Sequence, residues 1–348
     1  MLRPKKLENY VGQEHLKIQI SRAIQASKYK NEAFGHTLFT GASGCGKTSI
    51  SAVIASEMGV NFEPVFATSI TKPDDIKEIL RSKLNQDGYS HDNPEPIIPS
   101  AIKPTVLFID EIHNLSLKVR ETLYTVMEDR VYWEEDKNPW NGKKQTRKTW
   151  VPKFTLIGAT TREGILEKAF LDRFRYIFKI EKYTPKECES FVINALENVK
   201  KTVKDLAIEP NAITQIAMRS RGVARTAIHL TERCIDHLIG SNCGFQLTEE
   251  ITKDAFKTMH IDELGLTPAD YKILIYLAKC FRPTGLASLA SFLEELPASI
   301  ESKYEPHLLS SGYMIRTPQG RVISESGFDL LKKKGLIKQE TRRVLLDE

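Results

Sequence analysis

One glycine-rich stretch decides the fold of this chain: Gly41-Ala42-Ser43-Gly44-Cys45-Gly46-Lys47-Thr48. It matches the pattern GxxxxGK followed by Ser or Thr at every fixed position. An apolar run at residues 36–40 precedes it and is typical of a buried strand, while residues 49–58 have the pattern of a helix. Backbone N–H groups of such a turn, together with the positive end of the helix dipole, attract phosphate oxygens. This phosphate loop therefore predicts a nucleotide site.

The spacing of the loop assigns a role to its residues. Lys47 is placed to contact the β- and γ-phosphates of ATP, and the Thr48 hydroxyl is placed to bind Mg²⁺. The small Cys45 side chain is one that the turn tolerates. We also expect nucleotide contacts from Gly41, Gly44, Cys45, Gly46 and Ser49.

An acidic pair ends a second apolar run. Residues 105–109 (TVLFI) predict a buried strand, and Asp110 and Glu111 follow it directly. Asp110 at the strand tip can hold the metal through water, whereas Glu111 can polarise the attacking water as a general base. Since binding alone does not need Glu111, the pair predicts ATP hydrolysis. A third buried strand is expected at residues 154–158.

The order of the apolar runs predicts the class of fold. Strand-like runs that alternate with helical periodicity over residues 1–182 are typical of an α/β domain with a parallel sheet. Such runs stop after Tyr183, so residues 183–262 predict a small helical domain. Helices followed by two short strands predict a winged-helix domain at residues 263–336, and a basic tail occupies residues 337–348.

Two segments interrupt the first domain. Residues 86–104 predict an irregular insertion because they carry Asp-Gly, Asn-Pro and further prolines. Residues 130–153 predict a protruding hairpin with arms at 131–133 and 149–151. The hairpin mixes many charges with three tryptophans, which are Trp133, Trp140 and Trp150.

Composition excludes several classes of protein. The 348 residues are 41% hydrophobic and 27% charged, with a mean hydropathy of −0.32, which argues against a membrane protein and against wholesale disorder. The N-terminus is polar and lacks an apolar signal core, so a cytoplasmic location is expected. The net charge of +5 is too small to identify a nucleic-acid binder. Five scattered cysteines without CxxC spacing predict neither disulfides nor a zinc site.

The motifs, taken in order, resemble those of AAA+ ATPases and, more narrowly, of the RuvB family, the bacterial motors that drive branch migration of Holliday junctions. The resemblance runs from residue 3 to about residue 331. The colinear segments that carry it are 10–14 (YVGQE), 107–113 (LFIDEIH), 127–129 (MED), 154–162 (FTLIGATTR), 171–174 (LDRF), 219–222 (RSRG) and 316–321 (RTPQGR).

The resemblance implies further contacts to ATP. Arg225 would be a sensor on the helical domain that reports the γ-phosphate. Thr161 or Thr160 would be a polar sensor that touches the γ-phosphate or the attacking water. The residues that would border the adenine or line the nucleotide are Leu2, Arg3, Tyr10, Val11 and Tyr183.

The resemblance also implies contacts to a neighbouring subunit and to DNA. Arg173 would be an arginine finger that reaches the site of the next subunit, and Glu128 and Asp129 would face that site. A guanidinium delivered in this way stabilises charge in the transition state. Read without the family, Arg173 fits an ordinary ion pair equally well. Arg316 and Arg321 flank the turn of the wing and would contact DNA phosphates, which hold a duplex without reading its sequence.

The chain departs from the family pattern at several places. The phosphate loop lacks the usual two prolines, and the sensor motif at residues 222–225 (GVAR) lacks its rigid proline. In the family the hairpin docks onto RuvA through an apolar tip, whereas residues 130–153 are strongly polar here. A RuvA-like partner is therefore in doubt, and the basic and aromatic side chains suit a different partner or direct DNA contact. This divergence favours a viral or plasmid relative.

The sequence leads to one main hypothesis and two alternatives. The main hypothesis is an ATP-dependent homo-oligomeric ring, expected to be a hexamer, that translocates duplex DNA and moves four-way junctions. The first alternative is a clamp-loader-like remodeller, although loaders carry Ser-Arg-Cys near the finger and a helical collar instead of a wing. The second is a DNA-binding regulator in which ATP only supports assembly.

Overall fold

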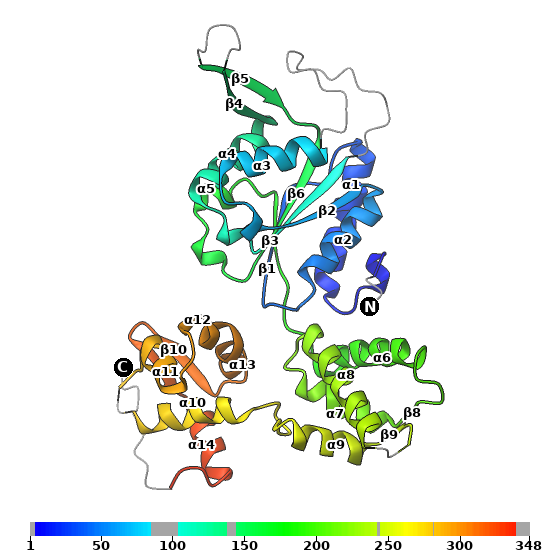
Figure 1. Cartoon of the computed structure of the whole chain (residues 1–348), viewed down its shortest axis with the longest axis vertical. Helices are drawn as coiled ribbons and strands as arrows, with labels where there is room; N and C mark the ends of the chain where they lie inside the picture. Colours follow the sequence, from blue (N-terminus) through cyan, green and yellow to red (C-terminus); the bar gives the residue numbers. More distant parts are fainter. Residues whose placement is uncertain (1–3, 85–103, 138–143, 242–243, 281, 339–348) are drawn as a thin grey trace. The chain divides into compact units, whose positions relative to one another are not determined.

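A computed structural model describes residues 4–84, 104–137, 144–241, 244–280 and 282–338. These residues form two compact units, Met1–Tyr183 and Thr184–Glu348 (Figure 1). Within the described ranges, no helix combines the length and the apolar character needed to cross a membrane.

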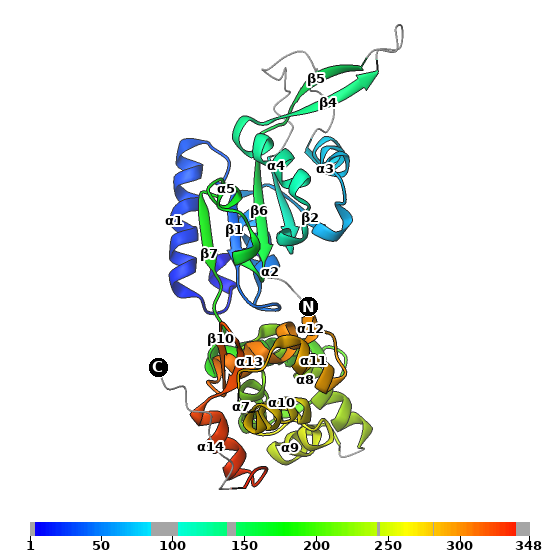
Figure 2. The same ribbon diagram turned by 90° about the vertical axis from the view of Figure 1, so that its left-hand side faces the viewer.

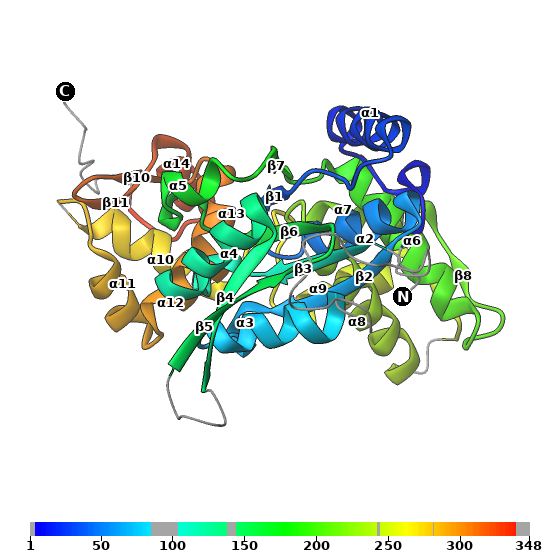
Figure 3. The ribbon, with the colours of Figure 1, turned by 90° about the horizontal axis from the view of Figure 1, so that it is seen from above.

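The first unit is built on a five-stranded parallel sheet with the strand order β2-β3-β6-β1-β7. Helices α2 and α4 cover opposite faces of this sheet (Figure 3). The strands are β1 Thr37–Thr40, β2 Asn61–Phe66, β3 Thr105–Asp110, β6 Phe154–Thr160 and β7 Tyr176–Lys179. The helices are α1 Glu14–Lys30, α2 Lys47–Met58, α3 Pro73–Ile79, α4 Leu117–Asp129 and α5 Lys168–Leu171.

The predicted strands and the α/β class are confirmed. Every residue of β1 and β6 is buried, as are the first five residues of β3, because helices cover both faces of the sheet. Strands buried on both sides need continuous apolar runs, which is the pattern that the sequence showed. Strand β6 lies between β1 and β3, so the carboxyl ends of these three strands adjoin one another.

The predicted hairpin is confirmed in its arms. Strands β4 (Val131–Lys137) and β5 (Lys144–Trp150) pair antiparallel and project from the sheet unit (Figure 2). Tyr132 and Thr149 are buried at its base, whereas Trp133 is 53% exposed. The tip, with Trp140, lies outside the described residues, as do nearly all of the expected insertion and most of the basic tail.

The second unit begins with helices. Thr184 caps α6 through a capping box, in which its hydroxyl accepts from the Glu187 N–H at 3.2 Å and the Glu187 carboxylate accepts from the Thr184 N–H at 2.7 Å. Pro185 lies in the first turn, where the fixed φ of proline suits the start of a helix. The elements are α6 Pro185–Lys200, β8 Ala207–Ile208, α7 Pro210–Arg219, α8 Ala224–Gly240, β9 Gln246–Leu247 and α9 Glu249–Thr258.

The rest of the second unit has the predicted winged-helix order. Two short antiparallel strands follow several helices, and Gly320 with φ of +146° allows the wing to approach Thr284 closely. The elements are α10 Pro268–Lys279, α11 Leu286–Leu293, α12 Pro297–Ser299, α13 Glu305–Ser310, β10 Met314–Thr317, β11 Gly320–Ile323 and α14 Glu325–Lys333. A separate apolar core lies under these elements.

A partly buried histidine ties three elements of the sheet unit together. The Nδ1 atom of His36 accepts from the Leu156 N–H at 2.8 Å, and its Nε2 atom lies 3.3 Å from the carbonyl oxygen of Met127. Because the N–H of Leu156 can only donate, the ring is neutral and carries its proton on Nε2. Burial lowers the pKa of His36 from 6.5 to about 4.

We expect His36 to make this unit sensitive to acid. Between pH 6.5 and pH 4 the unfolded chain binds a proton that the folded chain does not, so the free energy of unfolding falls as the pH falls. The loss by pH 4 is on the order of 3 kcal/mol. His36→Asn can still accept from Leu156 but cannot titrate, so urea unfolding of this variant should depend less on pH. His15→Asn, at an exposed position, is the control; an unchanged pH slope in His36→Asn would refute the prediction.

Candidate nucleotide and DNA sites

The backbone of the phosphate loop requires glycine at several positions. Gly41, Gly44 and Gly46 have φ values of 142°, 79° and 98°, in the region that side chains disfavour. A Cβ atom at Gly46 would lie 2.5 Å from the Tyr10 hydroxyl, and one at Gly41 would lie 2.4 Å from the Ile180 carbonyl oxygen. The loop therefore packs tightly against its surroundings and keeps a defined shape.

Lys47 folds back over this loop. Its Nζ atom donates to the carbonyl oxygens of Gly41 at 2.8 Å and Ala42 at 3.1 Å, and the residue is 6% exposed. Thr48 follows in the first turn of α2 and is partly buried. The ammonium group therefore lies across the strand-to-helix turn, where the sequence predicted it to serve phosphate.

Two buried tyrosines support the loop from behind. The Tyr183 hydroxyl donates to the Cys45 carbonyl oxygen at 2.9 Å and lies 3.2 Å from the Tyr10 hydroxyl, and both residues are 4% exposed. Burial raises the pKa of Tyr10 to about 12, so this hydroxyl stays neutral. The structure thus brings Tyr10 and Tyr183, which are far apart in sequence, to the nucleotide loop. Val11 follows Tyr10, while Leu2 and Arg3 lie outside the described residues.

The acidic pair ends β3 beside β6. Glu111 has a φ of 50°, and its Oε2 atom accepts from the Thr161 hydroxyl at 3.1 Å. Asp110 accepts from the Glu111 N–H at 3.0 Å. Of the two threonines that the resemblance left open, Thr161 contacts Glu111, whereas Thr160 is fully buried. Thr161 is therefore the one placed to act together with Glu111.

His113 links the acidic pair to β6. Its Nδ1 atom lies 2.9 Å from the Thr160 hydroxyl and 3.3 Å from Glu111 Oε2. Burial is the main cause that lowers the pKa of His113; Glu111 opposes this shift, while the cations Arg162 and Lys47 add to it. Strand β6 lies between β1, which leads into the phosphate loop, and β3, which ends in the acidic pair, so the loop and the pair lie at the same edge of the sheet.

Arg173 lies at the surface of the sheet unit. One of its guanidinium nitrogens is 3.3 Å from Glu128 Oε2, another donates to the Ala169 carbonyl oxygen, and the guanidinium stacks 4.7 Å above the Tyr124 ring. The side chain is 29% exposed, and Glu128 is 64% exposed. Arg173 thus forms the ordinary ion pair that the sequence allowed, with Glu128, at the surface of the unit. Asp129, next to Glu128, ends α4.

The two wing arginines share an acidic partner. Arg316 and Arg321 stand directly opposite each other in the β10–β11 ladder, and both guanidinium groups contact Glu305, which is 1% exposed. Glu301 lies 3.7 Å from Arg316 and 3.4 Å from Arg321. Arg316 remains 50% exposed whereas Arg321 is 11% exposed. Only Arg316 is therefore widely accessible to a ligand among these two.

Several residues at these sites were missed from the sequence. The contact of His113 with Thr160 was not predicted from the sequence. Glu301 and Glu305 received no role, although their spacing of four residues in a helical segment places them on one face, which was an available signal. Arg225 is exposed in the first turn of α8, in the second unit.

The four cysteines in the described part of the chain are free thiols, and no group of three or more His, Cys, Asp or Glu residues that could hold a metal occurs there. Cys45 is fully buried within the phosphate loop. The oxygen donors expected for Mg²⁺ are one hydroxyl and one carboxylate, which suits a cation that keeps most of its water ligands.

Two models of protein families match this chain. The model described as Holliday junction DNA helicase RuvB P-loop domain matches residues 2–92 and 96–180. The model described as RuvB C-terminal winged helix domain matches residues 263–332. Together these matches cover more than half of the chain and include both the phosphate loop and the wing.

Individual relatives match over nearly the whole length. The Holliday junction branch migration complex subunit RuvB of Campylobacter lari is 37% identical over 335 residues, which cover 96% of this chain and 92% of the relative. The subunit of the same name from Thermotoga maritima is 35% identical over 334 residues, or 95% and 92% of the two chains. The solved structure of the Thermotoga maritima RuvB Holliday junction branch migration motor has a TM-score of 0.77 at 33% identity and covers 95% of this chain and 98% of that one.

Proposed function

Because this chain belongs to the RuvB family, we propose that it is an ATP-dependent motor that translocates duplex DNA and moves four-way junctions. The observation that carries this proposal is the position of Glu111. Its carboxylate is held by Thr161 at the end of the strand beside the phosphate loop. A protein that only bound ATP would not need a carboxylate there. The winged-helix domain supports DNA as the object that hydrolysis moves, and weighs against a clamp-loader-like remodeller.

Each residue of the nucleotide site has a separate task in this proposal. The phosphate loop holds the triphosphate through its N–H groups, and Lys47 exchanges its carbonyl partners for the β- and γ-phosphates. Thr48 and Asp110 hold Mg²⁺, which neutralises charge on the phosphates when bound. Glu111 accepts a proton from the attacking water, while Thr161 orients the Glu111 carboxylate.

The ring and the trans-acting arginine complete the proposed mechanism. In a homo-oligomer, expected to be a hexamer, Arg173 leaves Glu128 and stabilises the charge that develops at the site of the next subunit. Exposure of the pair on the surface supports this exchange, since exposed ion pairs are weak. Glu128 and Asp129 face the same neighbour, and Arg225 reports the γ-phosphate.

DNA is the proposed partner of the wing and of the hairpin. Arg316 contacts duplex phosphates from the exposed side of the wing. On the hairpin, Lys148 lies 4.5 Å above the Trp150 ring, and Trp133 stands directly opposite Lys148 in the ladder. Cations beside aromatic rings suit nucleic acid better than the apolar contact through which the family hairpin docks onto RuvA.

Replacing the proposed base should separate binding from turnover. Glu111→Gln keeps the size of the side chain but cannot take a proton, so we expect ATP turnover to fall by about 10²- to 10⁴-fold while ATP affinity is retained. Turnover and nucleotide binding would be measured on the same preparation. Glu163→Gln, at an exposed position, is the matched control. Persistent turnover in Glu111→Gln would disprove the mechanism.

Mixing two inactive variants should restore activity if the finger acts in trans. Arg173→Ala should lower turnover by about 10³-fold or more, because charge on the transferred phosphoryl group loses its stabiliser. A mixture with Glu111→Gln subunits forms sites that combine an intact base with an intact finger, so turnover should reappear in the mixture. Arg175→Ala, two residues further along, serves as the control. Co-assembled rings without any recovered turnover would show that Arg173 does not act across subunits.

The two wing arginines should differ in their effect on DNA. Arg316→Gln should weaken binding to duplexes of any sequence and reduce the slope of log K against log salt by about 0.9 for one lost phosphate contact. Arg321→Gln should mainly destabilise the wing, since Glu305 is 1% exposed and would lose a partner. Binding isotherms over a range of salt, together with thermal unfolding, give both quantities. If the slope of log K against log salt is unchanged in Arg316→Gln, Arg316 does not contact DNA phosphates.

A further inference from the structure

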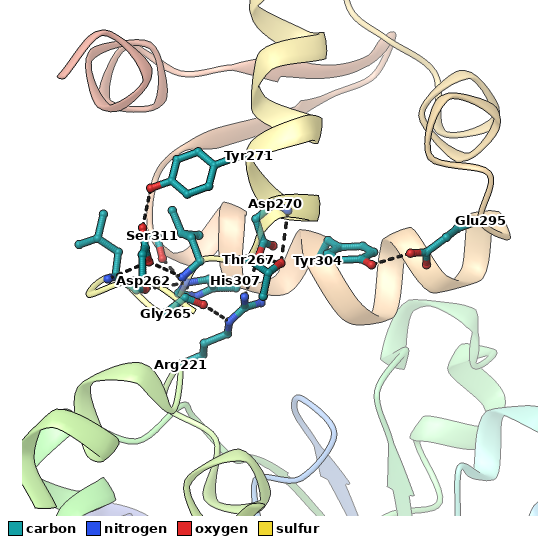
Figure 4. Close-up of polar contacts among 12 residues, drawn as sticks. Arg221, Asp262, Gly265, Thr267, Asp270, Tyr271, Glu295, Tyr304, His307 and Ser311 are labelled. Carbon is teal, nitrogen blue, oxygen red and sulfur yellow. Dashed lines mark hydrogen bonds and ion pairs between the residues drawn. The ribbon is translucent and has the colours of Figure 1, made fainter. Parts of the chain in front are cut away.

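One arginine joins the helical part of the second unit to its winged-helix part. Arg221 lies in the turn between α7 and α8 with a φ of 58°. Its Nε atom donates to the Gly265 carbonyl oxygen at 2.8 Å, and its Nη2 atom donates to Asp270 Oδ2 at 2.6 Å in α10 (Figure 4). We call these three residues the Arg221 joint.

The joint holds a fully buried charge. Asp270 is 0% exposed, and its Oδ2 atom also accepts from the N–H and the hydroxyl of Thr267 at 2.8 and 2.6 Å. Its Oδ1 atom has no hydrogen-bond partner among the described residues. Arg221 is therefore the cation that compensates the buried carboxylate, and a buried carboxylate that loses its cation is strongly unfavourable. This makes separation of the two parts costly.

The segment that links α9 to α10 is held against the winged-helix part by hydrogen bonds. Asp262 accepts from the Leu264 and Leu266 N–H groups at 3.0 and 2.7 Å, and from the Tyr271 hydroxyl at 2.5 Å. Lys334, after α14, reaches Glu263 at 2.6 Å. Figure 4 shows the contacts of Asp262 beside the start of α10. These contacts fix the segment to the winged-helix part.

The turn on the other side of the joint is fixed as well. The Arg219 guanidinium lies 4.6 Å above the Phe256 ring of α9, and the residue is 7% exposed. Gly265 has a φ of 73°, and a Cβ atom there would lie 3.1 Å from the Arg219 carbonyl oxygen, so the two backbones touch. Arg225, the proposed γ-phosphate sensor, follows Arg221 in the first turn of α8.

We infer that Arg221 is a positioning residue that transmits movement of the sensor segment to the DNA-binding domain. The segment from Arg221 to Arg225 is short, so a shift of Arg225 toward a γ-phosphate also shifts Arg221. Because Arg221 is tied to α10 through Asp270 and Gly265, the winged-helix part moves with it. Loss of the joint therefore uncouples ATP hydrolysis from DNA movement and leaves each partial activity in place. This inference rests on the proposed function.

The test compares three activities of the full-length protein. Arg221→Gln removes the charge but keeps a polar side chain, and Asp270→Asn keeps an acceptor for Thr267 while it removes the buried charge. Turnover of ATP without DNA and affinity for duplex DNA should change little in both variants. Movement of a four-way junction per ATP hydrolysed should fall by about tenfold or more. Arg221→Lys should recover part of the loss, and Arg233→Gln, exposed on α8, should behave as the native protein does.

The outcomes separate this inference from the proposed function. If the native protein neither hydrolyses ATP nor moves junctions, the proposed function fails. If it does both and the variants move junctions as efficiently per ATP, the inference is overturned. Parallel loss of all three activities, with or without a lower melting temperature, would mean that the joint has a structural role only, which also overturns the inference.

Discussion

The nucleotide site depends on the close approach of two tyrosine hydroxyls to the backbone of the phosphate loop. Tyr10 and Tyr183 come from opposite ends of the sheet unit and meet behind Cys45 and Gly46. The Tyr10 hydroxyl stays neutral, since burial raises its pKa to about 12. A side chain at position 46 would displace this contact. The glycine therefore serves two purposes at once, because it allows the inward-facing N–H groups and also admits the support behind them.

The parts of this arrangement that repeat a local pattern could be predicted from the sequence. Strands β1, β3 and β6 are continuous apolar runs because helices cover both faces of the sheet, and the chemistry of Lys47 and Glu111 follows from their places after such strands. The start of α6 at Thr184-Pro185 can also be predicted, because a capping box is formed within four residues of sequence. Local physics decides these features, so local sequence reveals them.

Contacts between distant segments could not be predicted in this way. His36 accepts from Leu156, and Arg221 pairs with Asp270, across separations of 120 and 49 residues. Nothing near either residue in the sequence specifies its partner, and a charged side chain such as that of Arg221 usually lies at the surface. Glu305 is similar: only the folded wing places both arginines on it. The sequence thus supplied the reacting groups, whereas the groups that hold them emerged from tertiary packing.

The degree of burial of each ion pair indicates whether its arginine can change partner during the ATPase cycle. The pair of Arg173 with Glu128, whose side chains are 29% and 64% exposed, costs little to break, because water replaces the lost partner. In the proposed mechanism Arg173 exchanges this carboxylate for a phosphate, and the carboxylate orients Arg173 until the phosphate arrives. The pair of Arg221 with the fully buried Asp270 cannot be exchanged so cheaply, because the carboxylate would remain without a cation. A motor needs both kinds: contacts that are made and released in each cycle, and joints that stay closed while it moves.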